Sequence, residues 1–174
     1  MISLKAFLPT LSRFVELSPA ALYERQRALV RLELLPTPQA RGRNSGGAMA
    51  TPDAVAMMLI AVLATDNLSD MDSRIGTLAD QEAIDRRTGK ATQCRITKGK
   101  TLREALATVL ADSTKAGYLN LELARKAKTA RLVDTAEAFR PTQFGRQTKI
   151  RGVELTAVFS DLLSLSRELE KVNK

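Results

Sequence analysis

Apolar residues recur with a helical period along most of the chain, and residues that cap helices precede several of these runs. A short helix is predicted over residues 10–16, directly after Pro9. A longer helix is predicted over residues 19–34, because Ser18 is a good N-cap and Pro19 has no N–H to lose at the first helical position. A tight turn would join the two helices.

The longer helix divides into an apolar side and a polar side on a helical wheel. Its apolar positions are Ala21, Leu22, Ala28, Leu29, Leu32 and Leu35. The polar side chains that lie mostly across from them are Tyr23, Gln26, Arg27 and Arg31. A helix, a tight turn and a longer helix with a basic outer face have the spacing of a helix-turn-helix motif.

Three further helices are predicted in the middle of the chain. Residues 51–65 begin with a cap, a proline and a carboxylate and are apolar nearly all round, so we expect burial in the core or in a subunit interface. Residues 69–83 form an amphipathic helix with an acidic outer surface. Thr101 and Glu104 form a capping box, which opens a helix that runs to about Ala111.

The hydrophobic period changes after Gly117. Leucines alternate with polar residues over 119–123, which predicts a strand, and residues 130–139 are either a second strand or a helix. Residues 85–100 are predicted to form a basic loop or hairpin, and residues 140–151 another basic loop. The second half of the chain is therefore expected to contain strands as well as helices.

A long carboxyl-terminal helix is predicted over residues 153–172. Its apolar positions follow spacings of three and four residues and are Leu155, Val158, Leu162, Leu165 and Leu169. Such a seam suits pairing with a second copy of the chain, and it equally suits packing against the core of the same molecule. A homodimer held by this seam is therefore one of our expectations.

The charge of the chain narrows the class of partner. The 174 residues carry a formal net charge of +8 with a pI near 10.0, which favours a polyanion such as nucleic acid. The positive charge is concentrated in residues 1–50, 85–100 and 115–151, whereas residues 51–84 are acidic. A footprint for a phosphate backbone would form if the basic stretches met on one side of the fold. The alternative is a basic protein with no such partner.

Composition excludes several kinds of chemistry. The sequence has no histidine, which removes histidine-dependent nucleophiles and most zinc sites, and its one cysteine, Cys94, cannot form an internal disulfide. We expect no enzymatic activity, no catalytic residues, no metal and no cofactor. The longest apolar run, residues 54–64, is 11 residues and too short to span a bilayer, and the first residues do not follow the order of a signal peptide. A soluble cytoplasmic protein is expected.

The first quarter of the chain resembles the winged helix-turn-helix superfamily of DNA-binding proteins. The matching segments are TLSRFVEL as the supporting helix, SPAALYERQRALVRL as the recognition helix, ELLP as a short extended exit and TPQARGRNSGGAMA as the wing. Two features depart from the family pattern: Glu33 stands where a glycine often precedes the paired aliphatic residues, and no clear second wing strand precedes Thr51.

The resemblance implies a set of contacts to duplex DNA. A recognition helix in the major groove would bring its polar side chains to base edges, and a cationic glycine-rich loop behind it would reach a phosphate or the minor groove. Tyr23, Gln26 and Arg27 would then face bases, and Arg13 and Arg31 would meet phosphates. The complete set of expected DNA-binding residues is Arg13, Ser18, Tyr23, Gln26, Arg27, Arg31, Arg41, Arg43 and Asn44, the last three in the wing.

The same residues also allow a purely structural interpretation. Arg25, Arg27 and Arg31 could be solvated or paired with Glu24 and Glu33 on the same helix, and the glycine-rich loop could be a linker. This interpretation assigns no partner to the basic face.

The expected fold class is mainly α with some β (α+β): an amino-terminal winged helix-turn-helix, then helices, a small strand-containing segment and a long carboxyl-terminal helix. Residues 1–65 would be the DNA-binding region, and residues 66–174 would serve assembly or effector contacts. The expected function is sequence-specific binding of double-stranded DNA by a homodimeric transcriptional regulator, without a membrane partner. The alternatives are a component of DNA packaging or nucleoprotein assembly, and a protein-interaction module such as an antirepressor.

Replacing Arg41 and Arg43 together by alanine tests the predicted wing. Because wing cations would contact phosphates rather than bases, the double variant should weaken binding to all duplex sequences similarly and flatten its salt dependence. Fluorescence anisotropy titrations at several salt concentrations would measure both effects. An unchanged salt dependence would contradict the predicted wing.

Overall fold

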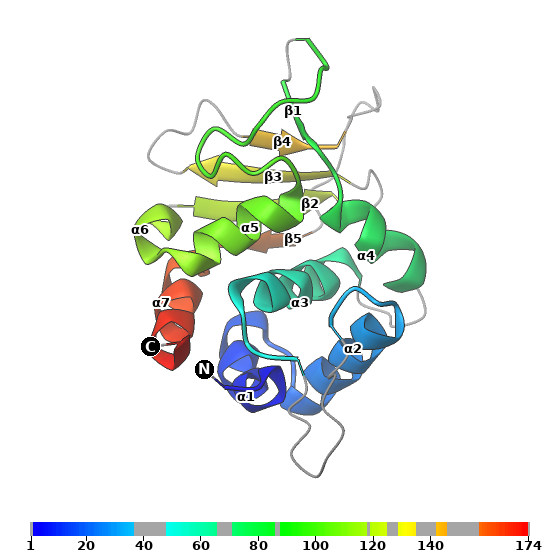
Figure 1. Ribbon diagram of the computed structural model, residues 1–174, viewed down its shortest axis with the longest axis vertical. Helices are drawn as coiled ribbons and strands as arrows, with labels where there is room; N and C mark the ends of the chain where they lie inside the picture. Colours follow the sequence, from blue (N-terminus) through cyan, green and yellow to red (C-terminus); the bar gives the residue numbers. More distant parts are fainter. Residues whose placement is uncertain are drawn as a thin grey trace.

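The computed structural model describes residues 2–36, 48–65, 71–85, 88–117, 119–124, 129–134, 142–145 and 157–173. Helices α1 (Leu4–Val15) and α2 (Pro19–Arg31) form one end of the molecule, and an antiparallel sheet forms the other (Figure 1). Helix α3 (Pro52–Ala64) crosses the middle, and α5 (Leu102–Ala111) lies between α3 and the sheet. The α+β class expected from the sequence is confirmed.

Helix α1 begins at Leu4 rather than at residue 10. The Ser3 side chain caps it by accepting a hydrogen bond from the backbone N–H of Ala6 at 3.2 Å, and the helix continues through Pro9. Burial of one apolar face offsets the hydrogen bond that the proline cannot donate. The predicted start at residue 10 was wrong. It was placed there because a proline often marks a helix boundary. The buried residues of this face are Leu4, Phe7, Leu8 and Leu11.

Helix α2 starts at Pro19 as predicted, but it ends at Arg31 and is not followed by an extended segment. Residues 32–35 form a turn in which Glu33 has a φ of 59° and the N–H groups of Leu34 and Leu35 donate to the carbonyl of Leu29 at 3.0 and 3.3 Å. The extended exit expected for residues 33–36 was therefore wrong. Leu35, which is 1% exposed, ties the turn to the core.

The expectation that residues 51–65 form a fully buried helix is confirmed by α3. Thr51 caps it by accepting from the N–H of Ala54 at 3.2 Å, and every residue from Ala54 to Ala64 is buried. Asp53, in the first turn, accepts two hydrogen bonds of 2.6 Å from the Arg103 guanidinium of α5. These bonds raise the pKa of Arg103, because the Asp53 carboxylate stabilises the protonated guanidinium that ties α5 to α3.

The predicted capping box at the start of α5 is confirmed with one change. The backbone N–H of Glu104 donates to the Thr101 hydroxyl at 3.2 Å, whereas the Glu104 carboxylate accepts from the N–H of Lys100 at 2.7 Å. Helix α4 (Met71–Ala79) stops before residue 83 because Ala83 pairs in a strand.

The sheet has five strands in the order β1-β4-β3-β2-β5, and every pair is antiparallel. The predicted strand at 119–123 is β2, and the segment that could have been strand or helix contributes β3. Part of the second predicted basic loop is strand β4. The strands are β1 (Ala83–Ile84), β2 (Leu119–Ala124), β3 (Thr129–Asp134), β4 (Thr142–Phe144) and β5 (Ala157–Phe159).

The long carboxyl-terminal helix predicted over 153–172 was wrong in its first part. Val158 lies in strand β5, which pairs with β2, and helix α7 covers only Leu162–Asn173. Leu162, Leu165 and Leu169 are 0%, 0% and 1% exposed, because α7 packs against the core of its own molecule. These three leucines are therefore not available as a dimer seam. Leu155 lies outside the described residues.

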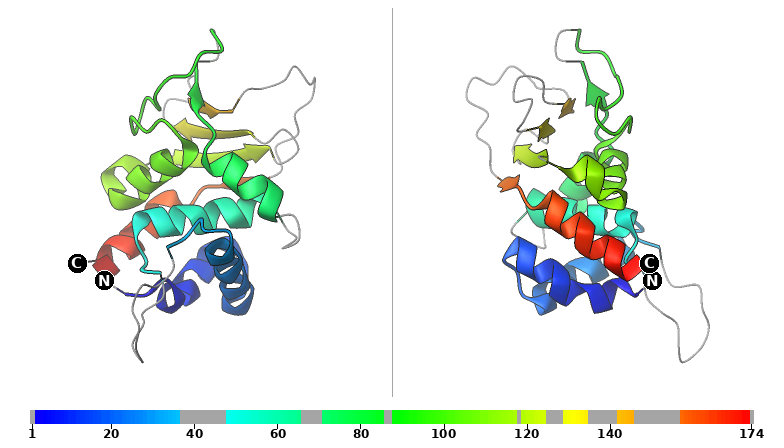
Figure 2. Two further views of the ribbon diagram at one scale, coloured as in Figure 1. Left: turned by 45° about the vertical axis from the view of Figure 1, so that its right-hand side comes forward. Right: turned by 90° about the vertical axis from the view of Figure 1, so that its left-hand side faces the viewer.

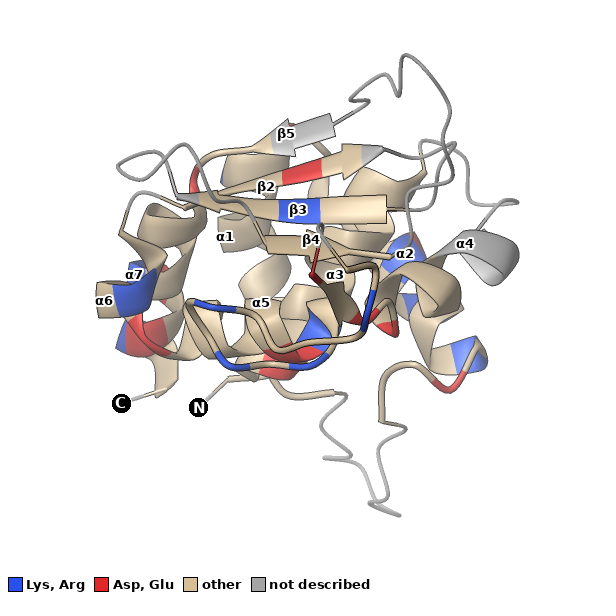
Figure 3. Cartoon of the chain, turned by 90° about the horizontal axis from the view of Figure 1, so that it is seen from above, with Lys and Arg blue, Asp and Glu red and all other residues tan. Residues whose placement is uncertain are grey.

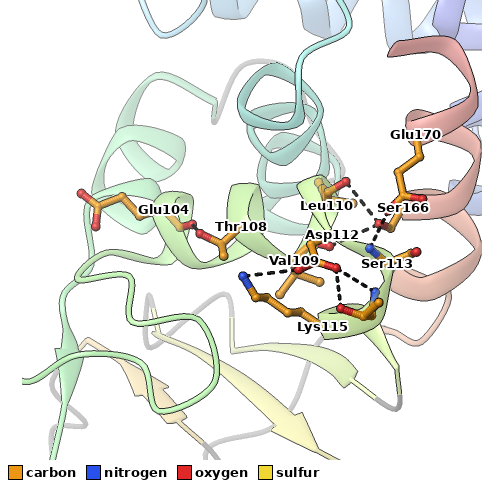
Figure 4. A network of polar contacts seen from close by, with 10 residues as sticks. Glu104, Thr108, Val109, Leu110, Asp112, Ser113, Lys115, Ser166 and Glu170 are labelled. Carbon is orange, nitrogen blue, oxygen red and sulfur yellow. Dashed lines mark hydrogen bonds and ion pairs between the residues drawn. The ribbon is translucent and has the colours of Figure 1, made fainter. Parts of the chain in front are cut away.

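Helices α5, α6 (Ser113–Ala116) and α7 meet in a network of polar contacts (Figure 4). The Ser166 hydroxyl, which is buried, lies 3.3 Å from the carbonyl oxygen of Val109 and 3.2 Å from that of Leu110. The Glu170 carboxylate accepts from the N–H of Ser113 at 2.7 Å. Side chains of α7 thus provide partners for backbone groups where α5 ends and α6 begins.

One hydrophobic core joins the helical end to the sheet. Its members on either side of residue 65 belong to a single cluster, so the predicted regions 1–65 and 66–174 share a core. Whether they are separate functional regions stays a prediction. None of the helices in the described ranges combines the length and the apolar character needed to cross a bilayer.

Replacing Ser166 by alanine should destabilise the protein by about 1–3 kcal/mol, because the one hydroxyl hydrogen within reach of the buried carbonyl oxygens of Val109 and Leu110 is lost. Ser164→Ala is the matched control, since Ser164 is exposed on the same helix. Urea unfolding followed by circular dichroism measures both free energies. Equal free energies of unfolding for the two variants would contradict the assigned role of Ser166.

Candidate nucleic-acid interface

Helix α2 is amphipathic, with its exposed face turned away from the rest of the molecule. Positions 22, 25, 26, 28 and 29 are buried, whereas Ala20, Glu24, Arg27 and Arg31 are exposed. Ser18 accepts a hydrogen bond from the N–H of Ala21 at 3.2 Å, so its hydroxyl is the helix cap that the sequence predicted. Its expected DNA contact stays a prediction.

Two arginines stand one turn apart on this exposed face. The Arg27 guanidinium lies 3.3 Å from both carboxylate oxygens of Glu24, and the two side chains are 65% and 51% exposed. An ion pair this exposed contributes about 0–1 kcal/mol, so a phosphate could replace the carboxylate at small cost. Glu24, Arg27, Ala28 and Arg31 line a shallow depression of about 270 Å³.

Gln26 was predicted to lie on the exposed face of α2, but it lies on the buried face. The residue is 6% exposed and shares the buried face of α2 with Leu22, Leu29 and Arg25, which is 5% exposed. Positions 22, 25, 26 and 29 follow one helical stripe, so the geometry of the helix overrides the polarity of the two long side chains. Gln26 cannot reach a base edge while α2 keeps this orientation.

Tyr23 and Arg13 both contact neighbouring side chains. Tyr23 is half-buried, with the Lys5 ammonium 4.9 Å from the centre of its ring. The Arg13 guanidinium lies 3.8 Å from a carboxylate oxygen of Glu168 on α7. A hydrogen bond from Lys171, with a smaller effect of Arg13, lowers the pKa of Glu168. Arg13 thus bridges α1 and α7 while its side chain stays 64% exposed.

The remaining predicted site residues, Arg41, Arg43 and Asn44, lie outside the described residues. Where the description resumes, the chain pairs with the amino-terminal segment: the N–H of Leu4 donates to Ala48 at 2.6 Å. An isolated antiparallel bridge joins Ser3 and Met49. The end of the predicted wing is therefore held against the start of α1.

A second basic surface is formed by residues 88–100, named here the basic loop. Its exposed cations are Lys90, Arg95, Lys98 and Lys100. The sequence predicted a basic loop or hairpin in this region and assigned no role to it. Backbone hydrogen bonds fix its shape: Thr92 donates to Ala83 at 2.8 Å, Ala83 to Lys100 at 2.7 Å, and Cys94 to Gly99 at 2.8 Å.

Buried side chains attach the basic loop to the sheet. Cys94 is 0% exposed, and its thiol lies 3.7 Å from the hydroxyl oxygen of Thr142 in β4. The same oxygen accepts from the backbone N–H of Arg95 at 3.4 Å. The cysteine therefore packs the loop against the sheet rather than presenting a reactive thiol to solvent.

The two basic surfaces lie at opposite ends of the molecule. Figures 1 and 2 show α2 beside α1 at one end and the basic loop next to the β1 edge of the sheet at the other. Figure 3 shows the cations spread along the basic loop. The described residues therefore do not bring these two basic stretches together on one side of the fold.

In the described part of the chain, no three His, Cys, Asp or Glu side chains are grouped so as to hold a metal ion. No family model, no curated protein and no solved structure matches the chain.

Gly99 is the residue on which the close packing of the basic loop depends. A Cβ atom there would lie 2.7 Å from the backbone nitrogen of Ala105 in α5, so Gly99→Ala should cost about 1–3 kcal/mol of stability. Gly76→Ala is the control, because a Cβ at Gly76 meets nothing within 4 Å and alanine favours its helix. Thermal unfolding would show a lowered midpoint for the first variant only. A midpoint for Gly99→Ala that matches the Gly76→Ala midpoint would contradict this packing.

Proposed function

We propose that this protein binds duplex DNA through the exposed face of α2 and regulates transcription. The observation that carries the proposal is the position of Arg27 and Arg31, one helical turn apart on the only face of α2 that the core leaves open. A helix with one basic face open to solvent fits the major groove, where arginine side chains reach bases and phosphates.

The proposed binding mode assigns the supporting role to α1 and the recognition role to α2, as in a helix-turn-helix. Residues 16–18 form the short connection, in which Glu16 adopts a left-handed conformation with a φ of 54°. Arg27 would exchange Glu24 for a guanine edge or a phosphate, and Arg31 would meet the backbone. Tyr23, which is half-buried, would contribute the edge of its ring and its hydroxyl. A wing formed by residues 37–50 belongs to the same proposal.

A component of nucleoprotein assembly is the second candidate. The distance between α2 and the basic loop favours it, because a protein with cations at both ends can contact more than one nucleic-acid segment. The burial of Leu162, Leu165 and Leu169 also removes the expected dimer seam, although a homodimer formed by another surface stays part of the regulator proposal.

Selection from fragments of the source genome distinguishes the two functions. The purified protein would be mixed with the fragments at about 150 mM salt with excess competitor DNA. A regulator should enrich a small set of fragments that share an inverted repeat. Binding without enrichment would favour nucleoprotein assembly, and no binding at all would leave a protein-interaction module.

Arg27→Ala should weaken binding to a selected site by about 1–3 kcal/mol and relax the preference for the base pair that Arg27 reads. Competition binding with single-base variants of the site measures both effects. The control is Arg167→Ala, which removes an exposed arginine of α7. If Arg27→Ala leaves the sequence preference unchanged, α2 is not the helix that reads the bases.

A further inference from the structure

The cations of the basic loop differ from most other cations that the structure describes. Arg27, Arg103 and Arg131 each form an ion pair with a carboxylate. In the described part of the chain, by contrast, no carboxylate pairs with Lys90, Arg95, Lys98 or Lys100. The four cations lie within residues 90–100, so their charge is open to an anionic partner without the loss of an ion pair.

The basic loop is ordered before any partner arrives. Its backbone bonds to Ala83, its buried Cys94 and the hydroxyl of Thr142 fix it at several points. Lys98 is further held at a left-handed φ of 62° by a hydrogen bond from its N–H to the carbonyl of Cys94. The loop backbone would therefore lose little conformational entropy when a partner binds.

The neighbours of these cations indicate what kind of anion they suit. Thr92 and Gln93 are exposed between them, Thr88 is exposed just before them, and Ile96 is half-buried against the core. Among the described residues, the only exposed large apolar side chain is that of Met49, which lies outside this loop. A protein interface or a membrane surface would call for an apolar anchor. Cations interleaved with hydroxyl and amide groups instead match the contacts that proteins make to phosphate and sugar.

We propose that the basic loop binds the phosphate backbone of a second duplex, so that one molecule links two DNA segments. The linking rests on the proposed function of α2, whereas the loop surface itself does not. Duplex DNA is stiff over about 50 nm, so a duplex docked on α2 does not bend back to the opposite end of the molecule. The loop must therefore recruit a separate segment.

Glu82 gives the surface a built-in opposing charge. Glu82 lines a depression of about 430 Å³ together with Ala91, Thr92, Gln93 and Lys100. Since a carboxylate there repels phosphate, Glu82→Gln should strengthen binding at the loop, in the opposite direction to the loss of any of its cations. Removal of the negative charge of Glu82 and removal of a loop cation should therefore change DNA binding at this surface in opposite directions.

A capture assay with the full-length protein tests the proposal. A mixed-sequence duplex is immobilised, the protein is bound at about 50 mM salt, and a second labelled duplex is added and counted. The loop variant combines Lys90→Gln, Lys98→Gln and Lys100→Gln. A control with the same change in net charge removes three exposed cations of α6 and α7 by Lys115→Gln, Arg167→Gln and Lys171→Gln, of which Lys115 and Lys171 form ion pairs.

The loop variant should bind the immobilised duplex as the control does but capture at least about tenfold less of the second duplex, and Glu82→Gln should capture more. Capture equal to the control would overturn the proposal, as would a wild-type protein that captures no second duplex. Arg27→Gln with Arg31→Gln separates the two claims. If this variant binds the immobilised duplex normally while the loop variant loses it, the α2 proposal fails and the loop surface stands.

Discussion

Burial of α3 on every side is the constraint on which the rest of the structure depends. All residues from Ala54 to Ala64 are buried, so the chain must cover this helix in each direction. Each large aliphatic side chain among them stabilises the fold by about 1.5–3 kcal/mol. Helices α1, α2, α4 and α5 provide the cover, and the orientation of α2 follows from it. Arg27 and Arg31 are exposed because the other face of their helix packs inward.

Local sequence signals predicted the parts of the fold that depend on local contacts. The caps at Ser18, Thr51 and Thr101 each accept the expected backbone hydrogen bond, and the strand at β2 follows directly from alternating leucines. Non-local contacts decided the parts that were missed. Residues 157–159 pair with β2, although Val158 fits the helical spacing of the apolar residues that follow it. The carboxyl-terminal helix is shorter than predicted as a result.

The candidate site could be predicted only in part for the same reason. Arg27 and Arg31 lie on the exposed face as the helical wheel indicated, whereas Gln26 is buried because its position on the stripe of Leu22 and Leu29 outweighs its polarity. The cations of the basic loop were visible in the sequence. Their fixed arrangement depends on Thr142, far along the chain, and no local pattern shows that contact.

The most direct test of the central claim is an NMR titration of the isotopically labelled protein with a short duplex DNA. Two separated surfaces, the exposed face of α2 and the basic loop, should show the largest chemical-shift changes. The amides of residues 18–31 should respond first, and those of 88–100 as the duplex comes into excess. Shift changes confined to other parts of the chain, or none at near-physiological salt, would contradict a DNA-binding function for both surfaces.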